Sequence, residues 1–173
     1  MITLSTLCYL EHDGCYLMLH RVTKQNDLNG GKWIGVGGRF EAGESPEDCL
    51  QREVREETGW SLRSWRFRGI VTFLYGDVTE YMHLFTSDDF ITEQGRAARD
   101  SGGCAIPVPA CDEGVLEWVP VKQVPNLELW EGDRIFLRLL RTWDAFFSLK
   151  LVYDTDGNLI DAVLNGNKIV LQG

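Results

Sequence analysis

The segment 45–59 most constrains the fold of this chain, because it carries signals for both ends of one helix. Ser45 is a suitable N-cap, since its side-chain oxygen can accept a hydrogen bond from a free amide of the first turn. Pro46 suits the first helical position, and the two acidic residues after it favour the positive end of the helix dipole. Gly59 suits the left-handed conformation that often ends a helix. The sequence therefore predicts a helix over residues 46–58.

Three glutamates of this helix form a continuous acidic edge. With about 100° between successive residues, Leu50 and Val54 share one apolar side and anchor the helix to a core. Glu57, Glu53 and Glu56 follow in that order around the helix, within an arc of about 100°. Like charges at these spacings repel one another, so a bound cation would relieve the edge, and clustered carboxylates beside a glycine loop suit Mg²⁺ or Mn²⁺. The alternative is an ordinary solvated glutamate face.

The residues around this edge resemble the Nudix box, G-x5-E-x7-R-E-U-x-E-E-x-G-U, in which U is a bulky apolar residue. The fixed positions are filled by Gly38, Glu44, Arg52, Glu53, Val54, Glu56, Glu57, Gly59 and Trp60. The pattern is long and gapless, so the chain is identified as a member of the Nudix family. The resemblance implies hydrolysis of a nucleoside diphosphate linked to another moiety. It also implies an α/β fold, the α/β/α sandwich with a central mixed β-sheet.

The resemblance further implies roles for individual residues. The implied metal ligands are Gly37, Glu53, Glu56, Glu57 and Glu113, with Mg²⁺ as the cofactor and Mn²⁺ as a substitute. One of these glutamates would position or deprotonate the attacking water. Glu113 has the alternative of being a solvated loop charge. Arg52 and Glu44 would form an ion pair that orients the glutamates without touching the substrate.

Four other stretches resemble the bacterial MutT-type branch of the family, whose members are 8-oxo-dGTP diphosphatases. They are GKWIGVGGRFEAGE, CDEGVLEWVP, LWEGDRIF and FFSLKLVYD. In that branch Arg21, Gly38 and Arg39 correspond to positions near the phosphates. Trp130 and Asp133 correspond to positions that face the base. The alternatives are ordinary surface cations for the two arginines, a packed residue at a helix entry for the tryptophan and a helix-dipole charge for the aspartate.

The remaining chain alternates between strand and helix patterns. Apolar spacing and turn signals predict a helix over 131–143 and strands over 2–10, 15–22, 66–75, 80–87, 115–119, 146–153, 159–164 and 168–171. Interleaved strands and helices indicate a mixed sheet with helices on its faces. We expect one domain over residues 1–173. Its segment 88–110 is expected to be a long loop insertion, passive in our interpretation, with closure over substrate as the alternative.

The net charge of −9 constrains the partners of the chain. Proteins that grip nucleic acid need a basic face, so this class is disfavoured, whereas a small anionic nucleotide can be held with the help of a cation. No apolar run approaches the ~18 residues that span a membrane, and the N-terminus lacks the basic start of a signal peptide. We therefore expect a cytoplasmic protein that acts on a nucleotide and binds no membrane, and we assign it no oligomeric state.

Three functions remain open. The first is hydrolysis of a nucleoside triphosphate to its monophosphate and pyrophosphate, with oxidised purines such as 8-oxo-dGTP as substrates. The second is hydrolysis of another derivative: the proline that ADP-ribose relatives carry after the box is missing, and Tyr75 keeps dinucleoside polyphosphates open. The third is a non-catalytic nucleotide-sensing module, which the complete set of box glutamates disfavours. Ile34 stands where animal relatives of the first class carry asparagine, so their scheme of base recognition does not transfer directly.

Overall fold

The computed structural model describes residues 1–23, 27–98 and 106–171 of the chain. The strands are β1 (Ile2–His12), β2 (Cys15–His20), β3 (Trp33–Ile34), β4 (Ser61–Tyr75), β5 (Val78–Ile91), β6 (Val115–Pro120), β7 (Phe147–Tyr153), β8 (Leu159–Leu164) and β9 (Asn167–Lys168). The helices are α1 (Pro46–Thr58) and α2 (Glu131–Thr142), with a short 3-10 turn, η2 (Val124–Asn126). No helix within the described residues is long and apolar enough to cross a membrane.

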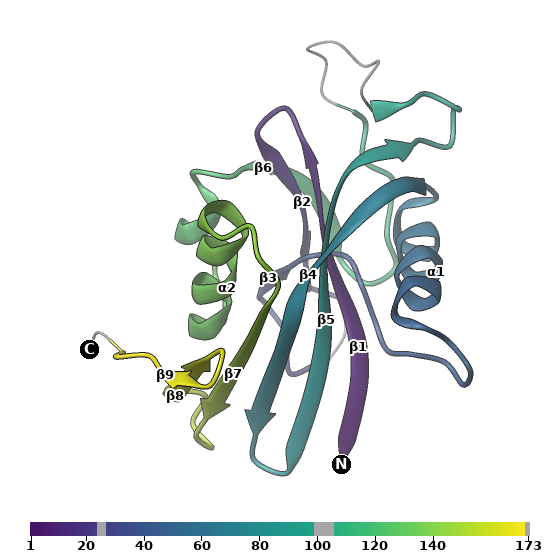
Figure 1. Ribbon diagram of the computed structural model, residues 1–173. Helices are drawn as coiled ribbons and strands as arrows, with labels where there is room; N and C mark the ends of the chain where they lie inside the picture. The colour runs from purple at the N-terminus through teal and green to yellow at the C-terminus, as the bar shows by residue number, and fades with distance from the viewer. Residues whose placement is uncertain (24–26, 99–105, 172–173) are drawn as a thin grey trace.

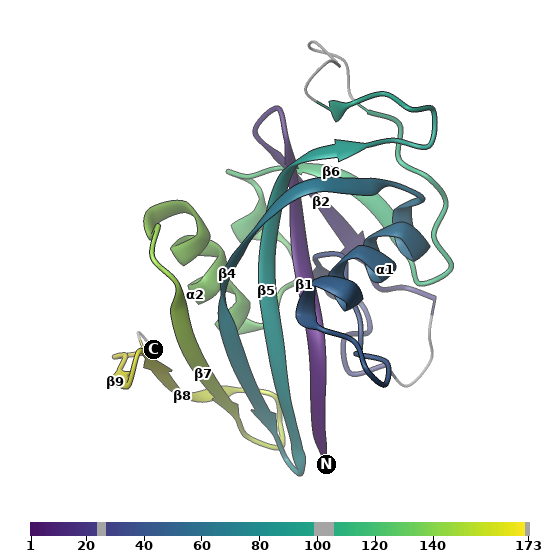
Figure 2. The same ribbon diagram turned by 45° about the vertical axis from the view of Figure 1, so that its right-hand side comes forward.

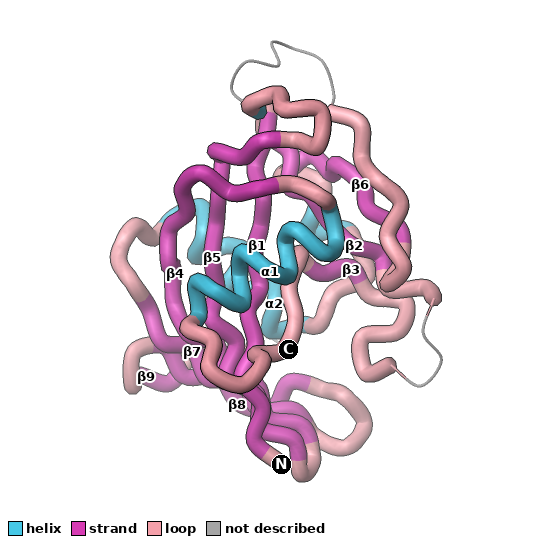
Figure 3. Tube along the Cα trace, turned by 90° about the vertical axis from the view of Figure 1, so that its right-hand side faces the viewer, coloured by secondary structure: helices cyan, strands magenta, loops and turns pink. Residues whose placement is uncertain are grey.

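The strands form one mixed sheet in the order β3-β2-β1-β5-β4-β7-β8-β9, and β6 pairs with β2 outside this path. The pairs β1–β5 and β4–β7 are parallel, while the other pairs are antiparallel. Helices α1 and α2 lie on opposite sides of the sheet (Figure 1). A turn about the vertical axis brings α1 forward, in front of the sheet (Figures 2 and 3). This arrangement confirms the α/β/α sandwich with a central mixed sheet.

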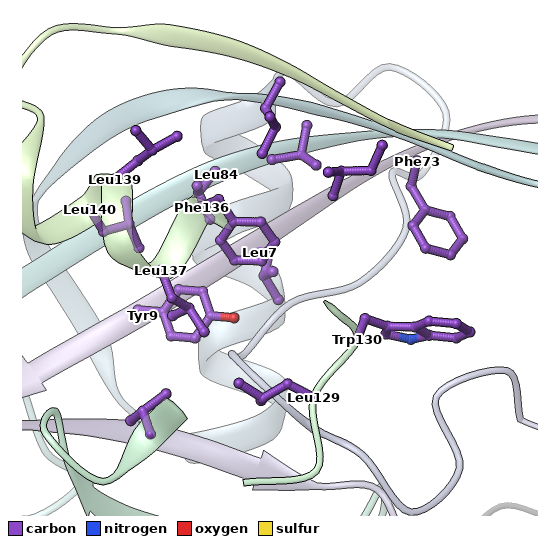
Figure 4. Packing of buried hydrophobic residues seen from close by; sticks show 14 of the residues in the cluster. Leu7, Tyr9, Phe73, Leu84, Leu129, Trp130, Phe136, Leu137, Leu139 and Leu140 are labelled. Carbon is purple, nitrogen blue, oxygen red and sulfur yellow. The ribbon is translucent and has the colours of Figure 1, made fainter. Parts of the chain in front are cut away.

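Alternating side chains of the central strand β1 enter two apolar clusters. Leu7 and Tyr9 belong to the cluster that includes α2, whereas Cys8 and Leu10 belong to the cluster that includes α1. Figure 4 shows the α2 cluster, where the rings of Tyr9 and Phe136 lie with their centroids 6.2 Å apart. Because both faces of β1 are covered at this point, residues 7–10 are a continuous apolar run rather than a strict alternation.

Helix α1 has the bounds and the caps that its sequence predicts. Ser45 Oγ accepts a hydrogen bond from the Asp48 N–H at 3.1 Å, and the Asp48 carboxylate accepts one from the Ser45 N–H at 3.0 Å. Gly59 ends the helix at a φ of 72°, and its N–H donates to the carbonyl of Arg55. These reciprocal bonds satisfy amides that the first turn leaves free. The caps therefore fix where α1 begins and ends, and with it the direction in which each of its glutamates points.

The β4–β5 hairpin is longer than predicted. β4 begins at Ser61 instead of residue 66, and β5 continues to Ile91 instead of residue 87. The pairing shifts register at three places near the open end of the hairpin. These irregularities interrupt the two-residue alternation on which the prediction rested. Residues 88–91 of the expected loop insertion are therefore strand.

The rest of the expected loop 88–110 is partly packed. Ala97 forms an isolated bridge with Ile91, and Ala98 and Ile106 are buried in the α1 cluster. Residues 99–105 lie outside the described part of the chain. Within the described residues, this segment is therefore attached to the core on both sides of the gap.

Two C-terminal bounds also differ from the prediction. Helix α2 ends at Thr142, and Trp143 follows with extended backbone angles. The expected strand over 168–171 is wrong beyond its first residue, because β9 covers only Asn167–Lys168. One further backbone hydrogen bond, from Ile169 N–H to the carbonyl of Ala162 at 2.8 Å, continues past β9.

Candidate active site

Helix α1 presents its three glutamates in order of burial. Glu57, next to the apolar anchor, is 6% exposed, whereas the side chains of Glu53 and Glu56 are 13% and 57% exposed. This is the order in which the helix geometry places them around the axis. The acidic edge is thus a graded one, which starts in the core and ends in solvent.

Arg52 ties the carboxylates of this region together. Its Nε donates to Glu44 Oε1 at 2.6 Å and its Nη2 to Glu44 Oε2 at 2.9 Å, so the expected ion pair is present as a two-point contact. Its Nη1 also donates to Glu53 at 2.7 Å and to Glu56 at 3.3 Å. The hydrogen bond from Arg52 is the main reason that the pKa of Glu44 falls to about 2. Arg52 therefore orients two of the edge glutamates by direct contact, in addition to its pair with Glu44.

Glu57 is the most perturbed carboxyl group of the site. Its pKa rises to about 8, first because burial disfavours the charged form and then because Glu53 and Glu113 are close and negative. A backbone hydrogen bond from Gly37 opposes this rise. One carboxylate oxygen, Oε2, is buried without a hydrogen-bond partner in the described structure. Burying a carboxylate oxygen without a hydrogen bond costs free energy, and a positively charged group bound to that oxygen would offset the cost.

The glycines before α1 allow its close approach to the sheet. A Cβ atom at Gly38 would collide with the carboxylate of Glu53, and one at Gly37 would collide with the backbone of Thr6 in β1. The backbone N–H of Thr6 donates to the Gly38 carbonyl at 2.9 Å. Gly37 and Gly38 thus form a backbone surface without side chains, here called the glycine wall, against which the carboxylate of Glu53 lies.

Glu113 reaches the site from the turn before β6. The antiparallel pairing of β6 with β2 sets Val115 opposite His20, so Glu113 lies beside Arg21. Arg21 Nη1 donates to Glu113 Oε2 in a short hydrogen bond. The negative charge of Glu113 also raises the pKa of Glu53 and Glu57, so the three carboxylates are near neighbours.

The donor set fits a divalent cation in its chemistry. Hard oxygen ligands are what Mg²⁺ and Mn²⁺ prefer, and the unpartnered oxygen of Glu57 is one such ligand. Among the described residues, no three acidic, histidine or cysteine side chains already converge as a metal cage. Arg52 and Arg21 hold Glu53 and Glu113 instead. A cation would therefore have to draw these carboxylates toward Glu57.

Trp130 lies at the entry of α2 and is packed on several sides. Its side chain is 9% exposed, and its ring meets those of Phe73, Tyr75 and Tyr153 edge-on. Its Nε1–H donates to Asn29 Oδ1 at 2.8 Å. The ammonium group of Lys32 lies 4.7 Å from the ring centroid. This environment is that of a packing residue at the helix entry, with little ring surface left for a ligand.

Asp133 is buried one turn further along α2. It is 5% exposed, and burial raises its pKa to about 7, with Lys32 and Arg134 opposing the rise. A solvated helix-dipole charge would be exposed, so the buried position is more than a dipole effect. The other residue expected near substrate, Arg39, is exposed, and its carbonyl accepts a hydrogen bond from Arg52 Nη2 at 2.9 Å.

Two polar residues of the β2–β3 connection join the site without having been predicted. Asp27 holds Arg21, and Asn29 holds Trp130. The segment 23–32 is polar and has no periodicity, so the sequence indicated only a loop there. Asp27 and the Asn29-Gly30 pair are typical turn residues and signal a folded loop. The partner of Asp27 is six positions away, but the partner of Asn29 is 101 positions away and cannot be named from a local pattern.

Comparison with known proteins identifies relatives that match most of the chain. The family model described as the NUDIX domain matches residues 2–140. The uncharacterized Nudix hydrolase YvcI of Bacillus subtilis is 32% identical over 168 residues, which cover 95% of each chain. The oxidized purine nucleoside triphosphate hydrolase of Danio rerio is 27% identical over 119 residues, or 68% of this chain and 67% of that protein.

Solved structures agree on the fold. The crystal structure of the MutT protein from Bacillus halodurans superposes with a TM-score of 0.75 at 22% identity, covering 94% of this chain and 97% of that one. The MutT protein from Methanosarcina mazei superposes with a TM-score of 0.65 at 23% identity, covering 83% of this chain and 96% of that one. At this level of identity the likeness concerns the fold alone.

Proposed function

The chain belongs to the NUDIX domain family and is a Nudix pyrophosphohydrolase, and from that premise we propose that it hydrolyses nucleoside triphosphates, with oxidised purines such as 8-oxo-dGTP as the preferred substrates. The products would be the nucleoside monophosphate and pyrophosphate. The observation that carries the proposal is Glu57, a buried carboxylate with an open oxygen beside Glu53 and Glu113. The similarity to the Danio rerio hydrolase supports the choice of substrate class. The cytoplasmic location expected from the sequence remains a prediction.

Members of the family generally need a divalent metal cation, and we propose Mg²⁺, with Mn²⁺ as a substitute. Glu53, Glu56, Glu57 and Glu113 would hold it, together with the Gly37 carbonyl. When bound, the cation neutralises charge on the phosphate oxygens as the anhydride bond breaks. Without it, a chain with a net charge of −9 would repel its substrate.

The residues of the chain supply position and proton transfer. Water attacks one phosphorus of the anhydride, the bridging P–O bond breaks, and pyrophosphate leaves. A carboxylate must accept the proton of the attacking water, and Glu57, the most buried carboxylate of the cluster, is one candidate for this base. Glu53 and Glu113 are the other bases within this cluster. We assign Arg52 a positioning role, because its guanidinium donates hydrogen bonds to Glu44 and Glu53 and so orients their carboxylates.

The phosphate end of the substrate is proposed to lie along the glycine wall. Arg39 is exposed next to Gly38 and can move toward a phosphate, since its side chain is on the surface. Arg21 is already held by carboxylates, so it would contact phosphate only after rearranging. We therefore place Arg39 first among the two arginines as a phosphate contact.

The base end is proposed to lie near the entry of α2. Asp133, with a pKa of about 7, exists in both forms near neutral pH. The ionised form accepts hydrogen bonds from purine N–H groups, and the protonated form can also donate to an oxo group. Trp130, which is only 9% exposed, would support the wall of this pocket through its packing. This pair supports a preference for an oxidised purine.

A hydrolysis screen tests the proposal. The purified chain is assayed with Mg²⁺ on 8-oxo-dGTP, dGTP, ADP-ribose and diadenosine tetraphosphate, and kcat/KM is compared. The proposal expects the highest value for 8-oxo-dGTP, with pyrophosphate as the second product. A higher value for ADP-ribose or the dinucleotide would overturn the substrate assignment. Tight nucleotide binding without turnover on any substrate would instead indicate a sensing module.

A further inference from the structure

Residues of the β2–β3 connection contact two parts of the molecule that lie apart in the sequence, the turn with Glu113 and the helix entry with Trp130. At one end Arg21 donates to Glu113, a carboxylate of the proposed metal cluster. At the other end Asn29 accepts the hydrogen bond of the Trp130 indole at 2.8 Å. Asp27 lies between them in the chain and contacts both sides. The connection therefore runs from the phosphate end of the site to the base end.

Asp27 fixes the direction in which the Arg21 guanidinium points. Arg21 Nε donates to Asp27 Oδ2 at 2.7 Å, and Nη2 lies 2.7 Å from the same oxygen. Nη1 is then the group directed at Glu113. The side chains of Arg21 and Asp27 are only 12% and 13% exposed, so water screens this ion pair weakly. The guanidinium is planar and rigid, so the contact with Asp27 and the contact with Glu113 depend on each other. A rotation that breaks one of these contacts also changes the geometry of the other.

The other oxygen of Asp27 continues toward Trp130. Asp27 Oδ1 accepts the Asn29 N–H at 3.2 Å, and the Asp27 carbonyl accepts the Gly30 N–H at 2.9 Å. Two backbone hydrogen bonds close the base of the connection, from Arg21 N–H to the Lys32 carbonyl and from Gly31 N–H to the Arg21 carbonyl. Within the described part of the connection, hydrogen bonds thus join Asp27 to Asn29, whose side-chain amide contacts the indole.

We propose that Asp27 and Asn29 are positioning residues that couple Glu113 to Trp130 through Arg21. This inference rests on the proposed function, in which Glu113 helps to hold the cation and Trp130 bounds the base pocket. A cation that attracts Glu113 competes with Arg21 for the same carboxylate oxygen. When Arg21 yields, Asp27 and the loop tip shift with it, and the hydrogen bond to the indole changes. Metal binding and the shape of the base pocket are then linked by a continuous set of hydrogen bonds.

The test follows the indole of Trp130 by NMR, with Mg²⁺ alone as the ligand. The Nε1–H resonance of Trp130 is assigned in ¹H–¹⁵N spectra by its loss in Trp130→Phe. Isothermal titration calorimetry establishes separately that Mg²⁺ binds. We expect Mg²⁺ to shift this resonance in the wild-type chain, and Asp27→Asn to reduce the shift by at least half while thermal melting shows that the variant is folded. Asn29→Ala leaves the Arg21–Asp27 ion pair intact but removes the hydrogen bond to the indole, so it should abolish the Mg²⁺-induced shift of the Trp130 resonance.

Asp144→Asn is the matched control, because it makes the same change of charge at a side chain that is 99% exposed, in the connection between α2 and β7. It should retain the full wild-type shift. Calorimetric Mg²⁺ binding with no movement of the Trp130 indole, or equal movement in all variants, would overturn the coupling and leave the proposed function standing. An indole that responds as expected in a chain that hydrolyses no nucleotide would overturn the proposed function and support the connection.

Discussion

Arg52 and Glu44 face each other through two parallel hydrogen bonds, Nε to Oε1 at 2.6 Å and Nη2 to Oε2 at 2.9 Å. The pair joins the turn before α1 to the middle of the helix. From this fixed point the remaining Nη1 reaches Glu53 and Glu56. The geometry of two edge glutamates therefore depends on this ion pair.

The first prediction concerns this pair. Arg52→Ala and Glu44→Gln should each lower kcat/KM, and the double variant should lose little more than Arg52→Ala, because both remove the same two-point contact. A coupling of about 0.5–3 kcal/mol is expected from the double-mutant cycle. Arg52→Lys should not restore activity, since a point charge cannot make both bonds. Fully additive losses would show that the two residues act separately.

The second prediction concerns Glu57. Glu57→Gln keeps the shape of the side chain but removes the charge, so kcat should fall by about 10²-fold or more. The melting temperature of the metal-free variant at pH 8 or above should rise, because a buried carboxylate no longer has to ionise. Glu53→Gln is the comparison: it should also lose turnover but gain less stability, because the hydrogen bond from Arg52 opposes the rise that burial causes in the pKa of Glu53. Near-normal turnover in Glu57→Gln would contradict its role.

The third prediction concerns the cation. Exhaustive chelation should abolish hydrolysis, because the glutamate cluster then has no group to neutralise the phosphate charge. Mg²⁺ or Mn²⁺ should restore turnover, whereas Ca²⁺ should bind and support little of it, since its coordination is longer and looser. The measurement is the hydrolysis rate after dialysis against chelator and after addition of each ion. A rate that survives chelation would remove the metal from the mechanism.

The fourth prediction concerns stability and pH. The pKa of Asp133 is about 7 in the folded chain and near its ordinary value when unfolded, so between those values the folded state binds the additional proton. Stability from this group is therefore present at low pH and falls as the pH rises toward 7. Relative to Asp133→Asn, the wild-type chain should lose up to about 4 kcal/mol of unfolding free energy between about pH 4 and pH 7. Urea unfolding at several pH values measures this difference, and a constant difference would contradict the raised pKa.

The fifth prediction concerns the choice of base. Asp133→Asn cannot take the ionised form, so its kcat/KM for 8-oxo-dGTP relative to dGTP should shrink about tenfold, equivalent to about 1.4 kcal/mol. Turnover of dGTP should change little, because the phosphate chemistry lies at the other end of the site. Steady-state assays on both nucleotides give the ratio. An unchanged ratio would assign base selection to residues other than Asp133.

Helix α1 and the order of its glutamates were determined by the sequence itself. Ser45 and Gly59 set the ends of the helix, and the spacing of Leu50, Glu53 and Glu57 set which carboxylate enters the core. These features depend on contacts between residues three or four positions apart, whose geometry the helix fixes. The Arg52–Glu44 pair also followed from the motif that the resemblance supplied.

The other half of the site was decided by tertiary structure. Glu113 meets Arg21 only because β6 pairs with β2, and no local pattern encodes which strand a strand will pair with. The bulges that lengthen β4 and β5 hid those strands from the two-residue pattern. The burial of Asp133 likewise comes from the sheet that α2 covers, not from the helix start that its neighbours in sequence indicate. Periodicity fixes the geometry within one helix or strand. The contact between Arg21 and Glu113 instead depends on the pairing of two strands far apart in the sequence, and this pairing is stable only as part of the complete sheet.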